Sequence, residues 1–287
     1  MRIVSHPVLC NYYLTYRCNA KCSFCDIWER PSPKADRQAV LSNLIALKRL
    51  GVRIIDFTGG EPLLHPELSQ FLKWARNLGF KTTVTSNGLL YHRRAHGLKG
   101  LIDLLHFSLD AADPDLHNRI RGVDCYDAVI ESLDLARSLG ERPDVLFTAT
   151  PETIDQLEAV YRTVSMPRGL TLIINPVFEY HEHGNQLNLS QLKHLRTWGR
   201  KPGIYLNDAF IELRLQGGNH ISRPVCRAAS TTIVISPDNQ LIVPCYHAET
   251  QSFPINNQLY QVWMSDEVQA WVKMEGRLPI CQGCTIN

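Results

Sequence analysis

The sequence lacks the features that would tie the chain to a membrane or to a polyanion. No apolar run reaches the length of a membrane-spanning helix, and the N-terminal MRIVSHPVLC lacks the long apolar core of a signal peptide. The formal net charge of +2 at pH 7 gives no electrostatic argument for a nucleic-acid partner. These absences predict a cytoplasmic protein, with no nucleic-acid partner and no membrane partner indicated.

The sequence also lacks low-complexity linkers, and it has no internal repeat beyond an alternation of strand-like and helix-like segments. Hydrophobic residues make up 44% of the 287 residues and charged residues 20%, which is ordinary for a soluble protein with a large core. This length suits one large domain, or a main domain with a small appendage. Nine cysteines are present, and in a reducing cytoplasm they are more often metal ligands than disulfide partners.

Three of the cysteines lie in one short stretch, CNAKCSFC. Cys18, Cys22 and Cys25 are separated by three and then two residues, so their thiolates can surround one soft metal centre from a single loop. Because a four-iron cluster needs four ligands, three cysteines leave one iron open to an external molecule. The spacing alone leaves two other readings open, namely three structural thiols or half of a zinc site.

Strand and helix patterns alternate along the first 176 residues. Strands are predicted over residues 8–15, 53–57, 81–85, 104–109, 144–150 and 171–176. Helices are predicted over residues 36–50, 68–78, 127–139 and 153–164. Six strands alternating with helices indicate an α/β fold with parallel pairing, in which ligands bind at the carboxyl ends of the strands. Beyond Val177 the alternation is no longer visible.

Short polar clusters follow three successive strands at their predicted carboxyl ends. They are Thr58-Gly59-Gly60-Glu61-Pro62, Thr85-Ser86-Asn87-Gly88 and Ser108-Leu109-Asp110. Glycines allow a backbone to approach a ligand closely, and the Glu61 carboxylate can accept from a cationic amine. Each cluster alone could be an ordinary turn. Three clusters at one edge of the sheet, after a three-cysteine loop, are not explained by turn chemistry.

In that order the motifs CNAKCSFC, GGEP, TSNG and SLD resemble the radical S-adenosylmethionine enzymes. The resemblance covers roughly residues 8–176 and implies a partial (β/α)6 barrel, followed by a small C-terminal α+β cluster-binding domain. It implies a 4Fe-4S cluster on Cys18, Cys22 and Cys25, with S-adenosylmethionine chelating the open iron. It also implies an external low-potential electron donor of the flavodoxin or ferredoxin type.

The resemblance assigns cofactor-binding roles to residues that match the family motifs. Gly59, Gly60 and Glu61 would hold the amino group of the cofactor. Ser108 and Asp110 would contact the ribose, and Ser86 and Asn87 would lie beside the cofactor. In the segment HNRIRG, Arg121 rather than Arg119 would pair with the cofactor carboxylate; a solvated arginine is the alternative.

Four further cysteines follow in the second half of the chain, Cys226, Cys245, Cys281 and Cys284. A hairpin is predicted over residues 231–243, and Ser265 is predicted to cap a helix before the final Cys-x-x-Cys. Four soft ligands suit zinc or an iron–sulfur cluster. The tail resembles the twitch form of the SPASM domain, which implies a second, auxiliary 4Fe-4S cluster. Gln240 stands where that pattern has glycine, so Asn239 is expected to make the turn.

These inferences divide the chain into a barrel core over 1–176, a connecting segment over 177–225 and an auxiliary cluster domain over 226–287. The expected activity is reductive cleavage of S-adenosylmethionine and hydrogen abstraction from a substrate. A small molecule is favoured, oxidised with the auxiliary cluster as electron acceptor. A maturase acting on a ribosomally made peptide is the alternative, although only 17 residues precede Cys18 and many maturases have a leader-binding module there.

A non-catalytic iron–sulfur or zinc protein on the same fold is a third hypothesis. The amine-binding carboxylate expected at a strand end counts against it, because a scaffold does not need one. No residue identifies the substrate or its acid and base groups. His181 and His183 are residue types that bind metals, but histidines two residues apart in a loop are weak signals; near the barrel mouth they could contact a substrate.

Overall fold

The computed structural model describes residues 6–178, 186–247 and 251–286, so His181 and His183 lie outside the described residues. The strands are β1 (Leu9–Tyr13), β2 (Ile54–Thr58), β3 (Lys81–Ser86), β4 (Leu104–Ser108), β5 (Asp144–Ala149), β6 (Leu172–Pro176), β7 (Ile204–Leu206), β8 (Thr232–Ile235), β9 (Gln240–Val243) and β10 (Gln251–Pro254). The helices are α1 (Arg37–Arg49), α2 (Leu68–Asn77), α3 (Tyr91–Leu98), α4 (Pro114–Arg121), α5 (Tyr126–Ser138), α6 (Leu157–Val160), α7 (Met166–Arg168), α8 (Leu189–Trp198), α9 (Asp208–Leu215), α10 (Ala228–Thr231), α11 (Leu259–Met264) and α12 (Asp266–Val272).

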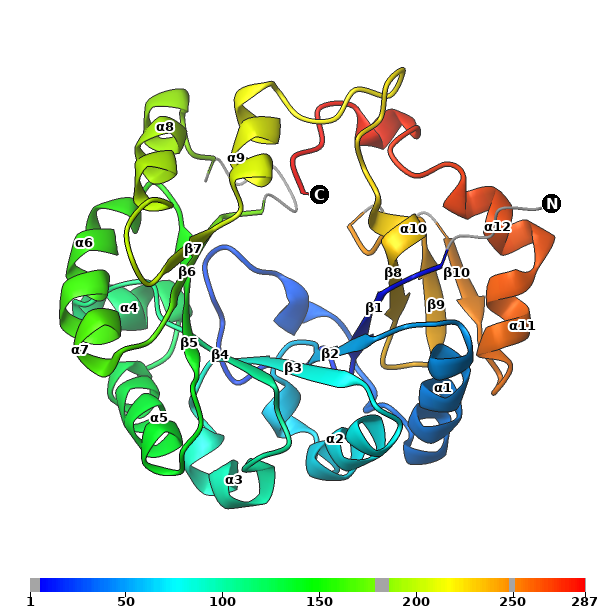
Figure 1. Cartoon of the computed structure of the whole chain (residues 1–287), viewed down its shortest axis with the longest axis horizontal. Coiled ribbons are helices and arrows are strands. Elements are labelled where there is room, and N and C mark those ends of the chain that lie inside the picture. The colour runs from blue at the N-terminus through cyan, green and yellow to red at the C-terminus, as the bar shows by residue number, and fades with distance from the viewer. Residues whose placement is uncertain (1–5, 179–185, 248–250, 287) are drawn as a thin grey trace.

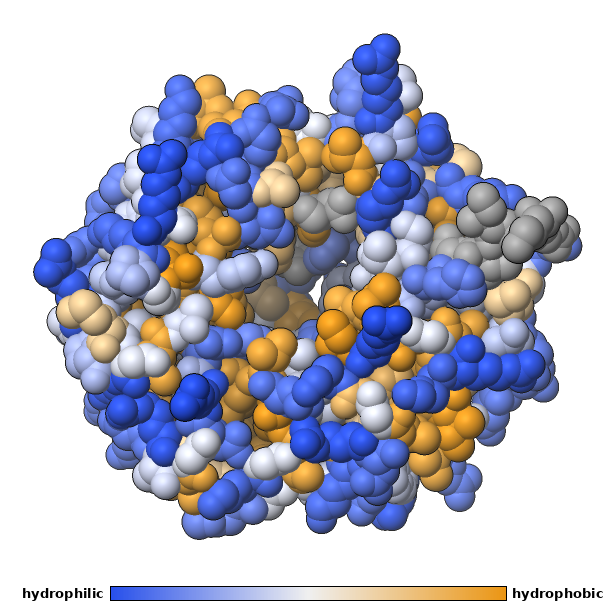
Figure 2. Space-filling view, in the orientation of Figure 1, coloured by the Kyte–Doolittle hydropathy of each residue, from blue (hydrophilic) through white to orange (hydrophobic). Residues whose placement is uncertain are grey.

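The strands form one curved sheet in the order β10-β9-β8-β1-β2-β3-β4-β5-β6-β7. Strands β1 to β7 pair in parallel with their neighbours, which confirms the predicted α/β fold. Figure 1 shows the sheet bent into an open ring, with helices around its outside and the blue segment that follows β1 inside it. Figure 2 shows a hollow at the centre of the same face.

Alternation along the strands separates an outer apolar face from an inner polar face. Phe57 of β2 packs against Phe71 of α2, and Phe107 of β4 packs against Tyr91 of α3. These four rings are fully or almost fully buried. Residues in between, such as Asp56, therefore point to the inside of the ring. The helices cover one face of the sheet, and the other face is left for a ligand.

Local sequence signals explain several element boundaries. Asp36 caps α1 as predicted, because its side chain accepts hydrogen bonds from Gln38 N and Ala39 N, each at 2.9 Å. Gly51 ends that helix with a φ of 88°. The predicted helix over 153–164 is divided into a 3-10 turn (Ile154–Gln156), α6 and a π-helical turn (Tyr161–Ser165), and α7 follows it.

The prediction that the alternation fails beyond residue 177 is wrong. Helix α8, strand β7 and helix α9 continue it, and β7 pairs in parallel with β6. β7 has three residues, which is too short for a recognisable pattern. Helix α4 was also missed, although Asp113 caps it and Pro114 occupies its first turn.

The C-terminal hairpin is part of the same sheet rather than a separate layer. β8 pairs in parallel with β1, so that Leu9 faces Thr232, while β9 pairs antiparallel with β8. Asn239 makes the turn with a φ of 61°, as expected where glycine is replaced. The division of the chain at residues 177 and 226 stays a prediction, although the sheet and its core run across both positions.

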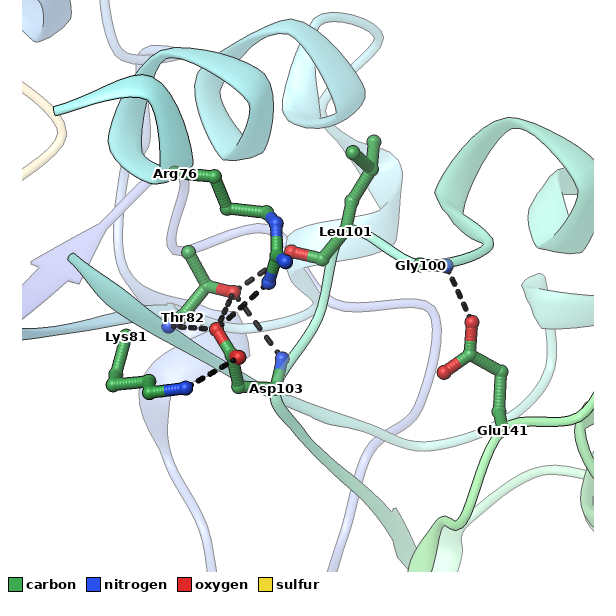
Figure 3. A network of polar contacts seen from close by, with 7 residues as sticks. All are labelled: Arg76, Lys81, Thr82, Gly100, Leu101, Asp103 and Glu141. Atoms are coloured by element: carbon green, nitrogen blue, oxygen red, sulfur yellow. Dashed lines mark hydrogen bonds and ion pairs between the residues drawn. The ribbon is translucent and has the colours of Figure 1, made fainter. Parts of the chain in front are cut away.

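A polar network at the start of β4 holds it against β3. The Asp103 carboxylate accepts hydrogen bonds from Thr82 N, Lys81 Nζ and Arg76 Nη1 at 3.0–3.1 Å, as Figure 3 shows. Partial burial opposes the charge on Asp103, but the bonds from Thr82 N and Lys81 outweigh it and lower its pKa to about 2. The network therefore fixes the pairing of two strands that carry site residues at their other ends.

Among the described residues, no helix has both the length and the apolar character that crossing a membrane requires.

Candidate functional site

A cavity with a volume of about 220 Å³ lies at the carboxyl ends of β1 to β4. It is lined by all three cysteines of the CNAKCSFC loop and by most of the predicted cofactor residues. The predicted residues on its wall are Cys18, Cys22, Cys25, Gly59, Gly60, Glu61, Ser86, Asn87, Ser108 and Arg121. Asp110 does not line it. Motifs more than 100 residues apart in the sequence therefore meet around one small space.

Gly59 and Gly60 bring two stretches of the chain together. Gly60 N donates to Thr15 O at 2.8 Å, and Glu61 N donates to Arg17 O at 2.9 Å. A Cβ atom at Gly59 would lie 2.1 Å from Thr15 O, and one at Gly60 would lie 2.3 Å from Arg17 O. The glycines are thus required by the backbone that leads into the cysteine loop, in addition to any ligand in the cavity.

Glu61 is buried at the cavity wall and holds two loops together. Its carboxylate accepts from Leu63 N at 2.9 Å, from Ser86 Oγ at 3.1 Å and from Asn87 N at 2.8 Å. Burial raises the pKa of Glu61 to about 7, although these bonds work in the opposite direction. A carboxylate has about four acceptor positions, so three donors leave room for one more.

Asn87 connects the TSNG segment to the cysteine loop. Its Nδ2 donates to Asn19 Oδ1 at 2.8 Å and lies 3.7 Å from Cys18 Sγ. Burial raises the pKa of the Cys18 thiol to about 12. A thiol in these surroundings does not ionise alone, but a thiolate there is stabilised once a metal cation is bound.

Arg121 reaches the cavity at the end of α4, whereas Arg119 pairs with Glu152 on the surface. Arg121 Nη2 lies 2.6 Å from Asp110 Oδ2, and its Nη1 lies 3.6 Å from Cys22 Sγ. Asp110, which is fully buried, also accepts from Thr148 N at 2.9 Å. Asp110 is therefore engaged behind Arg121. The Arg121 Nε is buried and has no hydrogen-bond partner among the described residues.

The end of α4 also supports the cysteine loop through its backbone. Lys21 N donates to Arg121 O and Ser23 N donates to Ile120 O, both at 2.9 Å. Gly122 ends the helix with a φ of 65°, and a Cβ there would lie 2.5 Å from Lys21 O. The HNRIRG segment thus supports the cysteine loop through backbone hydrogen bonds.

Sequence reasoning missed two further contributors to the site. Arg94, from a basic run on α3, donates to Leu63 O and His65 O and fixes the segment after Glu61. Tyr246 lines the cavity from the C-terminal tail and stacks on Tyr13 with ring centroids 4.3 Å apart. Only the position of Tyr246 directly after Cys245 could have drawn attention to it.

The four C-terminal cysteines also gather in one region. Burial raises the pKa of Cys226 to about 11, and the nearby thiols of Cys245 and Cys284 add to the rise. Burial likewise raises the pKa of Cys281, with a further contribution from Cys284. In the described part of the chain no three His, Cys, Asp or Glu side chains surround the position of a single metal ion. A four-iron cluster places each thiolate on a different iron.

The two cysteine groups lie at opposite ends of the strands. Cys18 comes after the carboxyl end of β1. Cys226 precedes β8, which runs parallel to β1, and Cys245 follows β9, which runs antiparallel. Because these strands have four or five residues, their two ends are about 15 Å apart. The inside of the ring therefore lies between the two groups.

A layer of polar side chains faces this interior, beneath the cavity. Thr58, Thr85 and Ser108 line the cavity, and two residues earlier on the same strands come Asp56, Thr83 and His106. Two residues of strand cover about 6.6 Å. Thr83 Oγ1 donates to Asp56, and His106 Nδ1 lies 3.2 Å from Asp144 Oδ2. The interior thus offers hydrogen-bonding groups one layer below the cofactor site.

The fold and the site together define a parallel α/β barrel with three cysteines grouped at the carboxyl ends of its strands. A family model described as the Radical SAM superfamily matches residues 12–164, which is more than half of the chain. The chain belongs to the radical SAM superfamily. Membership implies a 4Fe-4S cluster and S-adenosylmethionine as cofactors, and an enzymatic activity of the oxidoreductase type.

Two relatives are similar to the chain in sequence. The chain is 30% identical over 262 residues to the "Probable GTP 3′,8-cyclase" of Sulfurisphaera tokodaii, an alignment that covers 83% of this chain and 81% of that protein. It is 36% identical over 126 residues to the GTP 3′,8-cyclase of Chlorobaculum tepidum, covering 42% of this chain and 38% of that protein.

In structure the chain is similar to Streptococcus suis SuiB bound to the precursor peptide SuiA, with a TM-score of 0.77 and 19% identity. That alignment covers 94% of this chain and 67% of SuiB. A second similar structure is anSMEcpe with bound AdoMet, with a TM-score of 0.74 and 17% identity over 93% of this chain and 83% of that one. At these identities the likeness shows the fold.

The residues of the cavity fit the two cofactors that the family implies. Three thiols share its wall, and the donor set is that of an iron–sulfur cluster with one open iron. The Arg121 guanidinium and the remaining acceptor position on Glu61 have the charges that suit the carboxylate and the ammonium of an amino acid.

Proposed function

We propose that the cavity binds S-adenosylmethionine against a 4Fe-4S cluster on Cys18, Cys22 and Cys25. The observation that carries this proposal is that these three thiols share one small cavity with Glu61 and Arg121. Bound there, the two cofactors supply a 5′-deoxyadenosyl radical. Glu61 accepts from the cofactor ammonium, and the Arg121 guanidinium attracts its carboxylate while it stays anchored on Asp110.

Ser86, Asn87 and Ser108 complete the polar wall of the cavity. Asn87 holds the cysteine loop through Asn19, and Ser86 orients Glu61. Ser108 faces the cavity from the end of β4, where it can contact the ribose. Tyr246, stacked on Tyr13, closes the side nearest the tail and keeps water from the reacting atoms. Asp110 acts through Arg121 in this proposal and not on the ribose.

The proposed substrate is a small polar molecule in the ring interior, over the layer formed by Asp56, Thr83, His106 and Asp144. Support comes from the position of this layer, one step below the cofactor cavity and between the two cysteine groups. A substrate bound there would lose one hydrogen atom to the 5′-deoxyadenosyl group, and then one electron and one proton. A second 4Fe-4S cluster on Cys226, Cys245, Cys281 and Cys284 would supply the electron acceptor.

Because four thiols would occupy all four irons of that second cluster, the substrate would not coordinate it. One molecule of S-adenosylmethionine would then be consumed for each product molecule, since the hydrogen atom is not returned. Flavodoxin or ferredoxin would supply the electron for each turnover. GTP is the first small molecule to test, because the aligned relatives are named for acting on it.

Iron analysis and 5′-deoxyadenosine assays test both centres. Reconstituted wild type should hold about eight irons, and the triple variant Cys18→Ala, Cys22→Ala, Cys25→Ala about four, with no 5′-deoxyadenosine formed from S-adenosylmethionine and dithionite. The double variant Cys281→Ala, Cys284→Ala should keep some cofactor cleavage but form no oxidised product. A folded triple variant without iron would contradict the second cluster. If the C-terminal cysteines instead retain zinc after reconstitution, the second cluster assignment would be replaced by a structural zinc site.

A further inference from the structure

A buried asparagine, Asn219, joins the chain segments that carry three of the C-terminal cysteines. It lies in the predicted connecting segment between α9 and α10, outside every motif, and is 2% exposed. An amide this deeply buried is costly unless its hydrogen-bonding groups are satisfied. What those groups contact shows what the residue does.

The side chain makes three hydrogen bonds to three places in the chain. Oδ1 accepts from Val225 N at 3.1 Å, directly before Cys226. Nδ2 donates to Gly276 O at 2.8 Å and to Cys281 O at 3.0 Å. One amide group therefore links the loop of Cys226 to the turn after α12 and to the backbone of Cys281.

The backbone of Asn219 adds two bonds to the last cysteine. Its N donates to Cys284 O at 2.8 Å, and its O accepts from Gly283 N at 2.8 Å. In total this residue makes five hydrogen bonds, and four of them involve backbone groups at or beside three cysteines. Cys245 is the remaining member of the group, and the pKa of Cys226 responds to it.

Two glycines around Asn219 allow the segments to approach this closely. A Cβ at Gly218 would lie 2.2 Å from Gly283 O. A Cβ at Gly276 would lie 2.7 Å from Pro224 Cβ and 2.9 Å from Cys226 Cβ. Both glycines have a positive φ, 87° and 67° respectively. Three features therefore hold the cysteine segments together: close contacts at glycines, backbone hydrogen bonds and the side-chain amide of Asn219.

We propose that Asn219 is the positioning residue of the second cysteine site and holds Cys226, Cys281 and Cys284 in place before metal arrives. This inference rests on the proposed function, because it assumes that the four cysteines bind a cluster. Groups that orient metal ligands from outside the coordination sphere typically change metal affinity 10- to 100-fold when they are removed. A merely structural asparagine would change the stability of the fold and leave metal retention unchanged.

The experiment uses the full chain with Cys18, Cys22 and Cys25 replaced by alanine, so that all bound iron reports on the second site. Asn219→Ala is added, and the rate of iron transfer to an excess of an iron chelator is followed by absorbance. We expect transfer roughly 10- to 100-fold faster than in the parent. The EPR spectrum of the dithionite-reduced cluster should also broaden or change.

Asn43→Ala is the matched control. Asn43 is equally buried and bonds to Tyr12 Oη at 2.9 Å and Asn239 Oδ1 at 2.8 Å, at the turn of the β8–β9 hairpin that is remote from the cysteines. It should lower the melting temperature and leave iron transfer unchanged. Asn219→Asp, which keeps the size and the acceptor for Val225 N but loses both donors, serves if the alanine variant does not fold, with the same accelerated transfer expected.

Iron transfer at the parental rate in both folded Asn219 variants would overturn the inference, as would equal acceleration in Asn43→Ala. A parent protein that holds no iron at all would instead remove the second cluster from the proposed function, and with it this role of Asn219. These outcomes separate a failure of the positioning role from a failure of the cluster assignment.

Discussion

In the proposed site Glu61 should make cofactor binding depend on pH, because burial raises the pKa of its carboxyl to about 7. With a pKa of about 7, roughly a tenth of this group is ionised at pH 6 and about three-quarters at pH 7.5. In the proposed site the cofactor ammonium would bind the ionised form, so affinity for S-adenosylmethionine should rise about five- to tenfold over this interval. Equilibrium dialysis with the reconstituted first cluster measures this change.

Glu61→Gln is the corresponding variant. It removes a charge-assisted contact worth about 1.5–3 kcal/mol, so affinity should fall roughly ten- to a hundredfold and its rise between pH 6 and 7.5 should disappear. The new amide would also face Asn87 N, which makes a check of folding necessary. Ser86→Ala keeps the carboxylate and should keep the pH dependence. A pH-dependent affinity in folded Glu61→Gln would exclude Glu61 as the titrating group.

Arg121 and Asp110 form a buried pair whose members depend on each other. Arg121→Ala leaves the Asp110 carboxylate without its cation and should destabilise the fold by about 3–5 kcal/mol. Removing both, as Arg121→Met with Asp110→Leu, should recover much of that loss, because no unpaired charge remains. Urea denaturation measures both variants. If the loss of stability in the double variant equals the sum of the losses in Arg121→Met and in Asp110→Leu, each measured alone, the two side chains do not act as a pair.

At the residue scale, motif spacing identified which side chains meet but not how each is used. Ten of the fifteen predicted site residues line one cavity, because parallel strands end at one edge. In the structure Asp110 forms an ion pair with Arg121. This pairing depends on the path of α4, which was not predicted from the sequence. Asn219 and Arg94 were missed for a similar reason: their partners are distant carbonyl groups, which have no sequence signal.

The pairing of β3 and β4 depends on one acidic side chain, Asp103. Because its pKa is lowered to about 2, its contribution to stability is complete above pH 5 and is lost as the pH falls toward 2. Asp103→Asn should cost roughly 1–2 kcal/mol at pH 7, and the difference from wild type should shrink between pH 5 and pH 3. Glu141→Gln, which changes a single bond to Gly100 N, is the control.

Urea titrations at several pH values measure this effect. A cost of Asp103→Asn that is the same at pH 3 and pH 7 would show that the amide fails for steric reasons and that the charge is unimportant. The Glu141 variant should remain within about 0.5 kcal/mol of wild type throughout.

At the element scale, capped and periodic segments were predictable. The sequence DRQAVLSNL identified α1 through its Asp36 cap and its apolar positions. β7 could not be found, because three residues show no alternation. α8 was overlooked despite a complete capping box from Asn188 to Gln191. Its signal was present in the sequence, after a stretch whose residues show no strand or helix pattern.

For the whole molecule, the pattern predicted a parallel α/β sheet, and the family resemblance implied that it forms a partial barrel. Neither indicated how the tail joins it. The hairpin over 231–243 was expected from local residues, and Asn239 made the turn as expected. The parallel pairing of this hairpin with β1 was not expected, because no short-range signal specifies a partner so far along the chain. The tail thereby contributes Tyr246 to the cavity wall, which a division into separate domains did not anticipate.

The pairing of Leu9 with Thr232 also sets the timing of assembly during synthesis. A ribosome that adds about 5–20 residues per second needs roughly 10–45 s to pass from the first partner to the second. Throughout this interval one edge of β1 has no neighbour, and exposed strand edges are prone to pairing with other chains. The loop with Cys18, Cys22 and Cys25 follows this same strand in the chain. Iron delivered before residue 232 is made would therefore reach the cysteines while the sheet that supports them is still incomplete.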